Sequence, residues 1–214
     1  MVAVCNFRSS AFSRETLVQR CPEVMAGLAA LSADLRIEAL TDSRALHATL
    51  FNGLAPAAFP DAAGVWRGTS GSSIETAPRA VFLACRLPGL KYRDICLPAD
   101  EVPAAMVEFE NEVLHLWQDR PGQDDAWRDA AFQALAGLTA RFFAIHPFMD
   151  GNGQVWRLML PFLAARLGLE TRSEWTVHQR PYGPEFSLAL QWHADHPSLL
   201  ADQLRRWFRP DTAP

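Results

Sequence analysis

Apolar residues recur every three or four positions through most of the chain between residues 99 and 168, and this period restricts the fold more than any other feature. It predicts three amphipathic helices. The three stripes consist, in chain order, of Val102, Met106, Phe109, Val113 and Leu116; Trp127, Ala131, Leu135, Leu138, Phe142 and Ile145; and Val155, Met159, Phe162, Leu163 and Leu167. Asp100 is expected to cap the first helix, and the second is expected to follow Asp124-Asp125. Gly168 is expected to end the third helix, which should bend at Pro161. Stripes of this kind bury against one another, so the sequence predicts a helical bundle.

Shorter elements are predicted around these three helices. A short helix is expected to start at Thr41-Asp42, and residues 55–78 read as a loop because they are rich in proline, glycine and serine. Two β-prone runs around a Pro-Gly pair predict a hairpin over residues 79–97. Two further helices fit residues 184–195 and 198–208. The predicted fold class is therefore mainly α with one small β-hairpin.

These elements suggest a division of the chain. Residues 1–40 are rich in leucine and alanine at helical spacing and are expected to form an N-terminal helical extension. Residues 41–208 are expected to form the main domain, and residues 209–214 a C-terminal tail.

The charge balance argues against a general nucleic-acid binder. The 20 Lys and Arg residues face 24 Asp and Glu residues, for a net charge of −4 and an isoelectric point near 5.9, whereas such a binder needs a basic field. The four cysteines show no metal-like spacing, so reduced and mostly buried thiols are expected. No signal peptide and no membrane-spanning run are evident. The expected location is the cytoplasm, or a host cell if the protein is delivered as an effector.

The connection between the second and third long helices is unusual for a turn. It reads His146-Pro-Phe-Met-Asp-Gly-Asn-Gly. Its proline is expected to end the incoming helix near His146, because the residue before a proline is disfavoured in the α region. Gly151 and Gly153 would allow positive φ on either side of Asn152, which would itself cap the next helix. The N–H groups at that helix start would then form a nest for an anion such as a phosphate chain.

Four polar side chains beside this nest extend the interpretation. Arg157 lies in the first turns of the helix, where a cation is unfavourable unless it meets an anion, and Gln154 lies three residues earlier on the same face. Asp150 offers the single carboxylate that Mg²⁺ combines with phosphate oxygens. His146, titrating near neutrality, suits a general base. The segment therefore predicts a nucleotide-phosphate site.

At this point the residues resemble a known family. The segment His146-Pro-Phe-Met-Asp-Gly-Asn-Gly-Gln-Val-Trp-Arg157 resembles the Fic-domain signature H-P-F-x-[D/E]-G-N-G-R-x-x-R. The segments Leu46–Phe51, Ala63–Arg67 and Arg180–Tyr182 also resemble parts of that family. The resemblance covers roughly residues 40 to 208, although only the central motif is specific.

The resemblance implies a fold, an activity and residue roles. It implies a Fic-type helical bundle, with a core motif over 146–157 and a flap over about 64–98 that pins a segment of a target protein. Fic proteins typically transfer AMP from ATP to a Ser, Thr or Tyr hydroxyl of a target protein, with Mg²⁺ as cofactor. By position, His146 would deprotonate the hydroxyl, Asp150 would hold Mg²⁺, Gly151, Asn152 and Gly153 would cradle the phosphates, Arg157 would reach the terminal phosphate, and Phe148 would anchor the loop.

Gln154 departs from the signature, which has an arginine at this position. A charge-assisted hydrogen bond contributes ~1.5–3 kcal/mol and a neutral one ~0.5–1.5 kcal/mol, so phosphate binding is expected to be roughly 5- to 30-fold weaker. Two alternatives stay open for this reason. One is a transferase that uses another nucleotide or another diphosphate-containing donor, and the other is a weakly active nucleotide-binding module.

An internal inhibitor of the kind that many Fic proteins carry is not expected. That element reads [S/T]-x-x-x-E-[G/N], and the one glutamate followed by Gly or Asn is Glu110, with Met106 at the Ser/Thr position. We expect the activity to be restrained by a separate inhibitory antitoxin protein, or not to be restrained at all. The expected partners are thus a nucleotide, a target protein and such an inhibitor, with no direct contact to nucleic acid or membrane.

Overall fold

The computed structural model describes residue 7 and residues 11–77, 96–118 and 125–208. Within these ranges the chain is helical and contains no β-strand, which confirms the mainly α prediction. The hairpin predicted over residues 79–97 falls almost entirely outside the described residues. The helices are α1 (Ala11–Ala30), α2 (Ala33–Thr41), α3 (Ser43–Phe51), the short 3₁₀ helix η1 (Ala99–Glu101), α4 (Val102–Gln118), α5 (Asp125–Ile145), α6 (Asn152–Arg166), α7 (Pro184–Gln191) and α8 (Pro197–Arg205).

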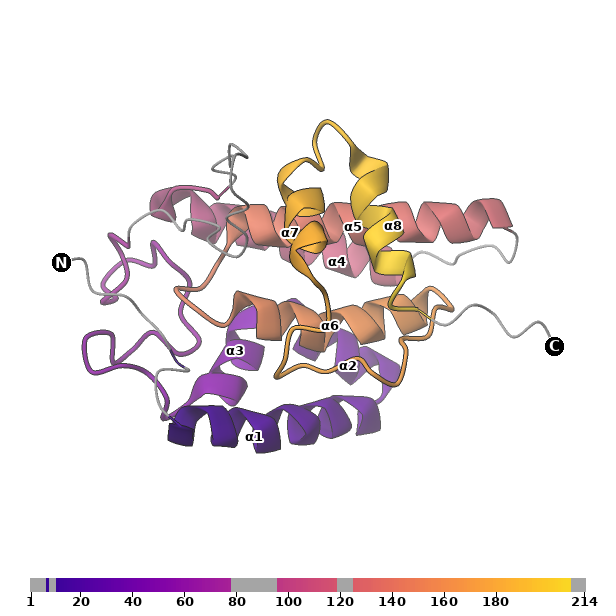
Figure 1. Ribbon diagram of the computed structural model, residues 1–214. Helices are drawn as coiled ribbons and strands as arrows, with labels where there is room; N and C mark the ends of the chain where they lie inside the picture. Colours follow the sequence, from indigo (N-terminus) through magenta and orange to yellow (C-terminus); the bar gives the residue numbers. More distant parts are fainter. Residues whose placement is uncertain (1–6, 8–10, 78–95, 119–124, 209–214) are drawn as a thin grey trace.

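The helices are arranged in layers around α6 (Figure 1). In that view α4 and α5 lie above α6, while α1, α2 and α3 lie below it. Helix α6 contacts α3, α4 and α5, and the adjacent helices α7 and α8 pack against α5. The loop after α5 therefore connects the upper layer to the central helix α6.

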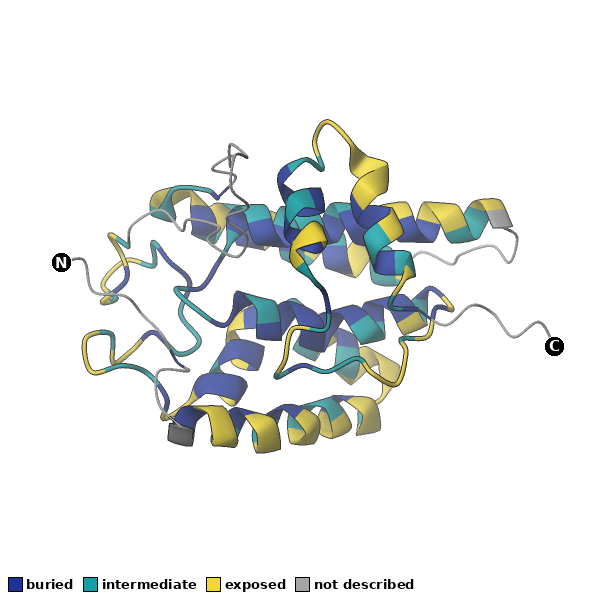
Figure 2. Ribbon diagram, in the orientation of Figure 1, coloured by how far each residue is buried: buried dark blue, intermediate teal, exposed yellow. Residues whose placement is uncertain are grey.

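Helix α6 is buried on nearly every side (Figure 2). Its buried residues include Asn152, Gln154, Val155, Trp156, Arg157, Leu158, Met159, Leu160, Leu163 and Ala164. A helix that is apolar around most of its circumference belongs in a core. The Trp156 ring stacks on Phe142 of α5, with ring centroids 5.4 Å apart, and meets Phe109 of α4 edge-on at 6.3 Å. This packing fixes the position of the α6 N-terminus.

Most helix ends follow the predicted local signals. Asp42 caps α3 by accepting a hydrogen bond from the N–H of Ala45 at 3.1 Å. Helix α6 is followed by Gly168 in the left-handed region, with a φ of 73°. The prediction that Asp100 caps α4 is wrong, because a 3₁₀ turn precedes this helix and Asp100 lies inside it.

Residues 11–41 form two helices, α1 and α2. Ser32, between them, caps α2 by accepting a hydrogen bond from the N–H of Leu35 at 3.4 Å. Leu35 itself, in the first turn of α2, is 52% exposed. Leu17, Cys21 and Leu28 of α1 are buried in the core.

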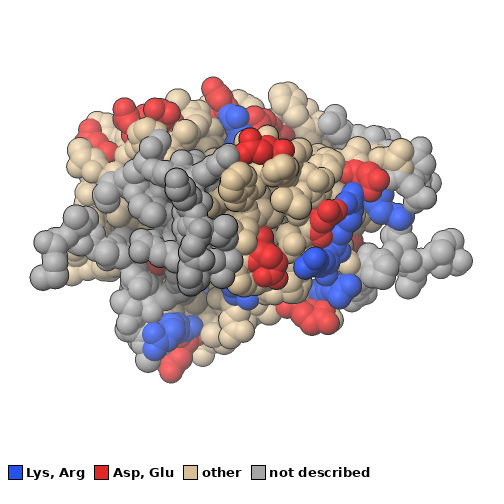
Figure 3. All heavy atoms as spheres, turned by 45° about the horizontal axis from the view of Figure 1, so that its top comes forward, with Lys and Arg blue, Asp and Glu red and all other residues tan. Residues whose placement is uncertain are grey.

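The surface matches the balanced composition. On the face shown in Figure 3, acidic and basic side chains are interspersed among uncharged ones. Of the cysteines, Cys21 and Cys96 are buried free thiols, as predicted, while Cys5 and Cys85 lie outside the described residues. In the part of the chain that is described, no helix combines the length and the hydrophobicity that a membrane crossing requires.

Candidate active site

The loop between α5 and α6 contains two residues in the left-handed region. Helix α5 ends at Ile145, as predicted from the proline that follows His146. His146 itself has a φ of 49°, which is uncommon for a residue other than glycine, and Gly151 has a φ of 85°. A Cβ at Gly151 would come within 2.4 Å of the Phe51 ring. Position 151 therefore requires glycine for its conformation and for its lack of a side chain.

Arg67, which is fully buried, holds the carbonyl groups where α5 ends. Its Nε donates to the His146 carbonyl at 2.8 Å, and its Nη2 donates to the carbonyls of Ile145 at 3.0 Å and Leu97 at 3.1 Å. Its backbone N–H donates to the Pro147 carbonyl at 2.7 Å. The carbonyls at a helix C-terminus lack partners within the helix, and the negative end of the helix dipole attracts a cation. Arg67 supplies both the hydrogen-bond donors for these carbonyls and the positive charge.

His47, on α3, holds the other end of the loop. Its buried imidazole accepts the N–H of Gly64 at Nδ1, at 2.9 Å. Because a backbone N–H only donates, Nε2 carries the ring proton and donates to the Asp150 carbonyl at 3.0 Å. Burial lowers the pKa of His47 to about 4, so its ring is neutral. The ring of Phe148, which is fully buried as expected for a loop anchor, stacks on the imidazole with centroids 4.0 Å apart.

Asn152 closes the loop on itself. The prediction that it caps α6 is wrong, because Gly151 occupies the cap position and Asn152 is the first helical residue. Its Oδ1 accepts the N–H of Phe148 at 2.9 Å, and its Nδ2 donates to the Phe148 carbonyl at 2.7 Å. The same Nδ2 lies 3.1 Å from Nδ1 of His146. Asn152 thus links the start of α6 to the candidate base.

The start of α6 presents two backbone donors. The N–H of Gln154 bonds back to the Gly151 carbonyl at 3.0 Å, but the N–H groups of Asn152 and Gly153 have no acceptor among the described residues. They lie at the positive end of the helix dipole, where anions bind. The expectation of a positive φ at Gly153 is wrong, since this residue lies within the helix.

His146, the candidate general base, is half-buried. Burial, together with the positive charge of Arg67, lowers its pKa to about 4. The expectation that it titrates near neutrality is therefore wrong, because that expectation left out the buried arginine. At neutral pH the ring is unprotonated and able to accept a proton, although a lower pKa makes it a weaker base.

Asp150, the candidate metal ligand, is also half-buried. Its Oδ1 accepts the N–H of Gly151 at 2.8 Å, and its Oδ2 accepts the N–H of Phe7 at 3.0 Å. The described residues contain no cluster of three side chains that could hold a metal. A lone carboxylate beside an anion site fits Mg²⁺ that is held mainly by phosphate oxygens and water.

Gln154, predicted to contact phosphate, is 2% exposed. Its Nε2 has no hydrogen-bond partner among the described residues. Buried polar groups almost always have a partner, so a donor without one, next to the start of α6, suggests that a ligand supplies the acceptor.

Arg157 lies beside the two backbone donors and is held from the other side by the segment 175–182. A Cβ at Gly153 would come within 2.9 Å of Nη1 of Arg157, which places the guanidinium against the first turn of α6. Its Nε donates to the Val177 carbonyl at 2.9 Å, and its Nη1 lies 3.4 Å from the Tyr182 hydroxyl. The side chain is buried and its orientation is fixed by these contacts.

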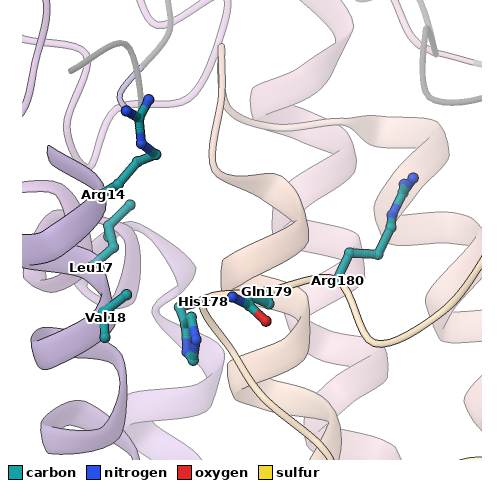
Figure 4. Close-up of a pocket in the computed structure, with 6 residues that line it drawn as sticks. All are labelled: Arg14, Leu17, Val18, His178, Gln179 and Arg180. Carbon is teal, nitrogen blue, oxygen red and sulfur yellow. The ribbon is translucent and has the colours of Figure 1, made fainter. Parts of the chain in front are cut away.

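A pocket of about 480 Å³ lies between α1 and this same segment (Figure 4). Its lining residues are Arg14, Leu17 and Val18 of α1 and His178, Gln179 and Arg180. In Figure 4 the two arginines stand on opposite sides. The lining contains no carboxylate, and the volume is within the range of small-molecule sites, ~300–1,000 Å³. Sequence reasoning missed this pocket because its two walls lie far apart in the chain.

His47 and Arg67 were also missing from the predicted site residues. A histidine on the apolar face of a predicted helix is one signal that could have identified His47. For Arg67 the signal is weaker, because its partners in the loop are 78 and 79 positions away.

Comparisons with known proteins identify a family and a similar fold. A model of the Fic/DOC family matches residues 36–164, more than half of the chain. A search of curated proteins finds no match. Among solved structures, the chain is similar to the "Type IV secretion system effector protein BepA", with a TM-score of 0.52 and 16% sequence identity. The match covers 92% of this chain and 61% of that one, and at this identity it shows the fold alone. On the strength of the family match, the chain belongs to the Fic/DOC family.

Proposed function

We propose that the protein is a protein nucleotidyltransferase that moves AMP from ATP to the hydroxyl of a Ser, Thr or Tyr side chain on a target protein. Family membership supports nucleotidyl transfer as the class of reaction. One observation carries the finer proposal. The loop between α5 and α6, together with the first turns of α6, brings together an imidazole, a carboxylate, two backbone donors at a helix N-terminus and a buried arginine.

In the proposed reaction the hydroxyl oxygen attacks the α-phosphorus of ATP while His146 takes the hydroxyl proton. The bond between the α-phosphorus and the oxygen that bridges to the β-phosphate breaks, and pyrophosphate leaves. The target then carries AMP through a phosphodiester bond. The rate would come mainly from alignment of the hydroxyl and from stabilisation of the charge on the phosphates.

Asp150 and the first residues of α6 would bind the donor. The N–H groups of Asn152 and Gly153 would bind phosphate oxygens, and Gln154 would add one neutral hydrogen bond from its buried Nε2. Arg157 would bind the terminal phosphate. Asp150 would hold Mg²⁺ together with the phosphates, and the bound ion would neutralise charge on them.

Labelled nucleotides test this proposal directly. The purified protein is incubated with a cell lysate and ATP labelled on either the α- or the γ-phosphate. We expect the added protein to increase protein-bound label from α-labelled ATP but not the label from γ-labelled ATP, which the kinases of the lysate transfer without it. His146→Ala should abolish this increase, and His115→Ala, which alters an exposed histidine on α4, should leave it unchanged. Label that persists in His146→Ala would contradict the proposal.

A second candidate is a transferase that uses another nucleotide or another diphosphate-containing donor. Gln154 favours it, because an amide in place of a guanidinium weakens the preference for a highly charged donor. Competition of unlabelled UTP, GTP and CTP against labelled ATP distinguishes the two candidates. A competitor that displaces the label at a lower concentration than ATP would favour the second one.

A further inference from the structure

We propose that His47 and Arg67 are positioning residues of this active site with separate tasks, Arg67 fixing the main chain of the base His146 and His47 fixing the metal ligand Asp150. The inference rests on the proposed function, because it assigns both residues a role in the transfer reaction. Neither residue touches the reacting atoms in this assignment.

Arg67 is placed to impose the unusual backbone of His146. One planar guanidinium bonds the carbonyls of Ile145 and His146, which lie on either side of the His146 Cα. Rotation about φ or ψ of His146 would break at least one of these bonds. The N–H of Arg67 holds the next carbonyl, that of Pro147. A left-handed conformation at a residue with a side chain persists where its surroundings impose it, and here it sets the direction in which the imidazole leaves the chain.

His47 is placed to fix the residue that would hold Mg²⁺. Its ring is itself immobilised, since Gly64 donates to Nδ1 and the Phe148 ring stacks on one face. From this fixed ring, Nε2 donates to the Asp150 carbonyl. The next residue, Gly151, turns the chain into α6. The main chain of Asp150 is therefore held between a rigid donor and a required glycine, and from this fixed main chain its carboxylate accepts the N–H groups of Gly151 and Phe7.

The two contacts meet the loop at different places, so their effects are separable. Arg67 bonds residues 145–147 and His47 bonds residue 150. A residue with a merely structural role would alter every property of the site in parallel. The proposal instead requires the rate constant to depend on one residue and the metal requirement on the other.

The first pair of variants is Arg67→Met and Arg67→Lys. Both lose the planar fork, and Arg67→Lys keeps the buried charge and serves as the decisive variant if Arg67→Met fails to fold. We expect kcat to fall about 100-fold in both, as for a small misplacement of a catalytic group, with the Mg²⁺ dependence unchanged. Full recovery of kcat in Arg67→Lys would overturn the assignment, because charge alone would then suffice.

The second pair is His47→Phe and His47→Gln. Phenylalanine keeps the stacking on Phe148 but removes both hydrogen bonds, whereas glutamine retains an N–H donor near the position of Nε2. Loss of a group that orients a metal ligand typically costs about 10- to 100-fold in metal affinity. We expect the Mg²⁺ requirement to rise by that factor in His47→Phe, less in His47→Gln, with kcat at saturating Mg²⁺ near the wild-type value.

Two measurements test the inference without any transfer activity. Binding of Mn²⁺ with α,β-methylene-ATP, followed by electron paramagnetic resonance, should weaken in the His47 variants and stay unchanged in Arg67→Lys. The carbon and proton chemical shifts of the His146 imidazole should change in Arg67→Lys and stay unchanged in His47→Gln. The assignment is wrong if Arg67→Lys and His47→Gln change the Mn²⁺ binding and the His146 chemical shifts equally. It is also wrong if Arg67→Lys leaves the chemical shifts unchanged and His47→Gln leaves the Mn²⁺ binding unchanged. Absence of transfer by the wild-type protein, with these two results as expected, would overturn the proposed function alone.

Discussion

The guanidinium of Arg157 lies against the bare Cα of Gly153, so that a Cβ at position 153 would come within 2.9 Å of Nη1. Arg157 is also bonded to the Val177 carbonyl at 2.9 Å, which limits how far it can retreat. This glycine therefore makes room for a side chain four residues later in the same helix. The glycine two positions earlier, Gly151, has a different role, because its φ of 85° is itself a glycine conformation.

The two glycines should respond differently to alanine. Gly153→Ala should keep the free energy of unfolding within about 1 kcal/mol of wild type, because the higher helix propensity of alanine offsets the contact with Arg157. It should weaken Mg-ATP binding by displacing the guanidinium. Gly151→Ala should lower the free energy of unfolding by roughly 2–4 kcal/mol, since it combines backbone strain with a clash against Phe51. Urea denaturation and calorimetric titration measure both effects. Equal stability of the two variants would contradict this distinction.

Gln154→Arg should bind ATP about 5- to 30-fold more tightly, because it replaces a neutral donor with a charged one. The gain in ATP affinity should be accompanied by a loss of stability. Position 154 is 2% exposed, so an unpaired guanidinium there should destabilise the nucleotide-free protein by roughly 3 kcal/mol. Melting temperatures with and without Mg-ATP measure both, and the shift on adding nucleotide should be larger than in wild type.

Gln154→Met is the matched control for that variant. It has a similar size but no polar group, so it removes the buried Nε2 that has no partner among the described residues. We expect the free energy of unfolding of the nucleotide-free protein to rise by up to about 1 kcal/mol and nucleotide binding to weaken. An affinity for ATP that is the same in the arginine, glutamine and methionine forms would show that position 154 does not contact the donor.

The helices could be predicted from the sequence because their signals are local. Four of the five residues in the stripe of α4 are buried, Val102, Met106, Phe109 and Val113. Their spacing alone determines which face they share. The end of α5 before Pro147 is equally local, since it follows from the geometry of one proline.

The supports of the site could not be predicted, because they depend on contacts between distant residues. His47 meets Asp150 across 103 positions, and Arg67 meets His146 across 79. The low pKa of His146 follows from burial and from that same arginine, so neither the base strength nor the backbone conformation was readable from the loop. The position of Asn152 was misjudged for a related reason, since its side chain bonds Phe148 and not the helix N-terminus.

Cys21 provides a test of how firmly α1 is docked. Burial raises the pKa of its thiol to about 11, despite the opposing charges of Arg157 and Arg20. At pH 8 the thiolate population should be about 100-fold below that of an ordinary exposed cysteine. We expect iodoacetamide to leave Cys21 unmodified in the folded protein and to modify it fully in urea, as followed by peptide mass mapping. The buried Cys96 is an internal control. Fast modification of Cys21 with Cys96 still protected would mean that α1 detaches from the core.

His47 should make the stability of the protein depend on pH. The pKa of its ring is about 4 in the folded protein, against an ordinary value of 6.5. The unfolded chain therefore binds a proton more readily than the folded one between these values, so this contribution is fully present above pH 6.5. It is lost as the pH falls through that window, and the loss reaches roughly 3 kcal/mol at pH 4.

Three other groups with shifted pKa values contribute in the acidic range, so the effect of His47 is measured as a difference. Burial raises the pKa of Glu110 to about 6, which opposes the trend, whereas burial lowers the pKa values of His146 and His193, which adds to it. All three groups are retained in His47→Phe. This variant should be less stable than wild type at pH 7.5, because the Gly64 N–H and the Asp150 carbonyl lose their partner. Its unfolding free energy, measured by urea denaturation between pH 7.5 and 4.5, should nevertheless fall less steeply with decreasing pH. Parallel curves for the two proteins would mean that the His47 imidazole is protonated as readily in the folded state as in the unfolded one.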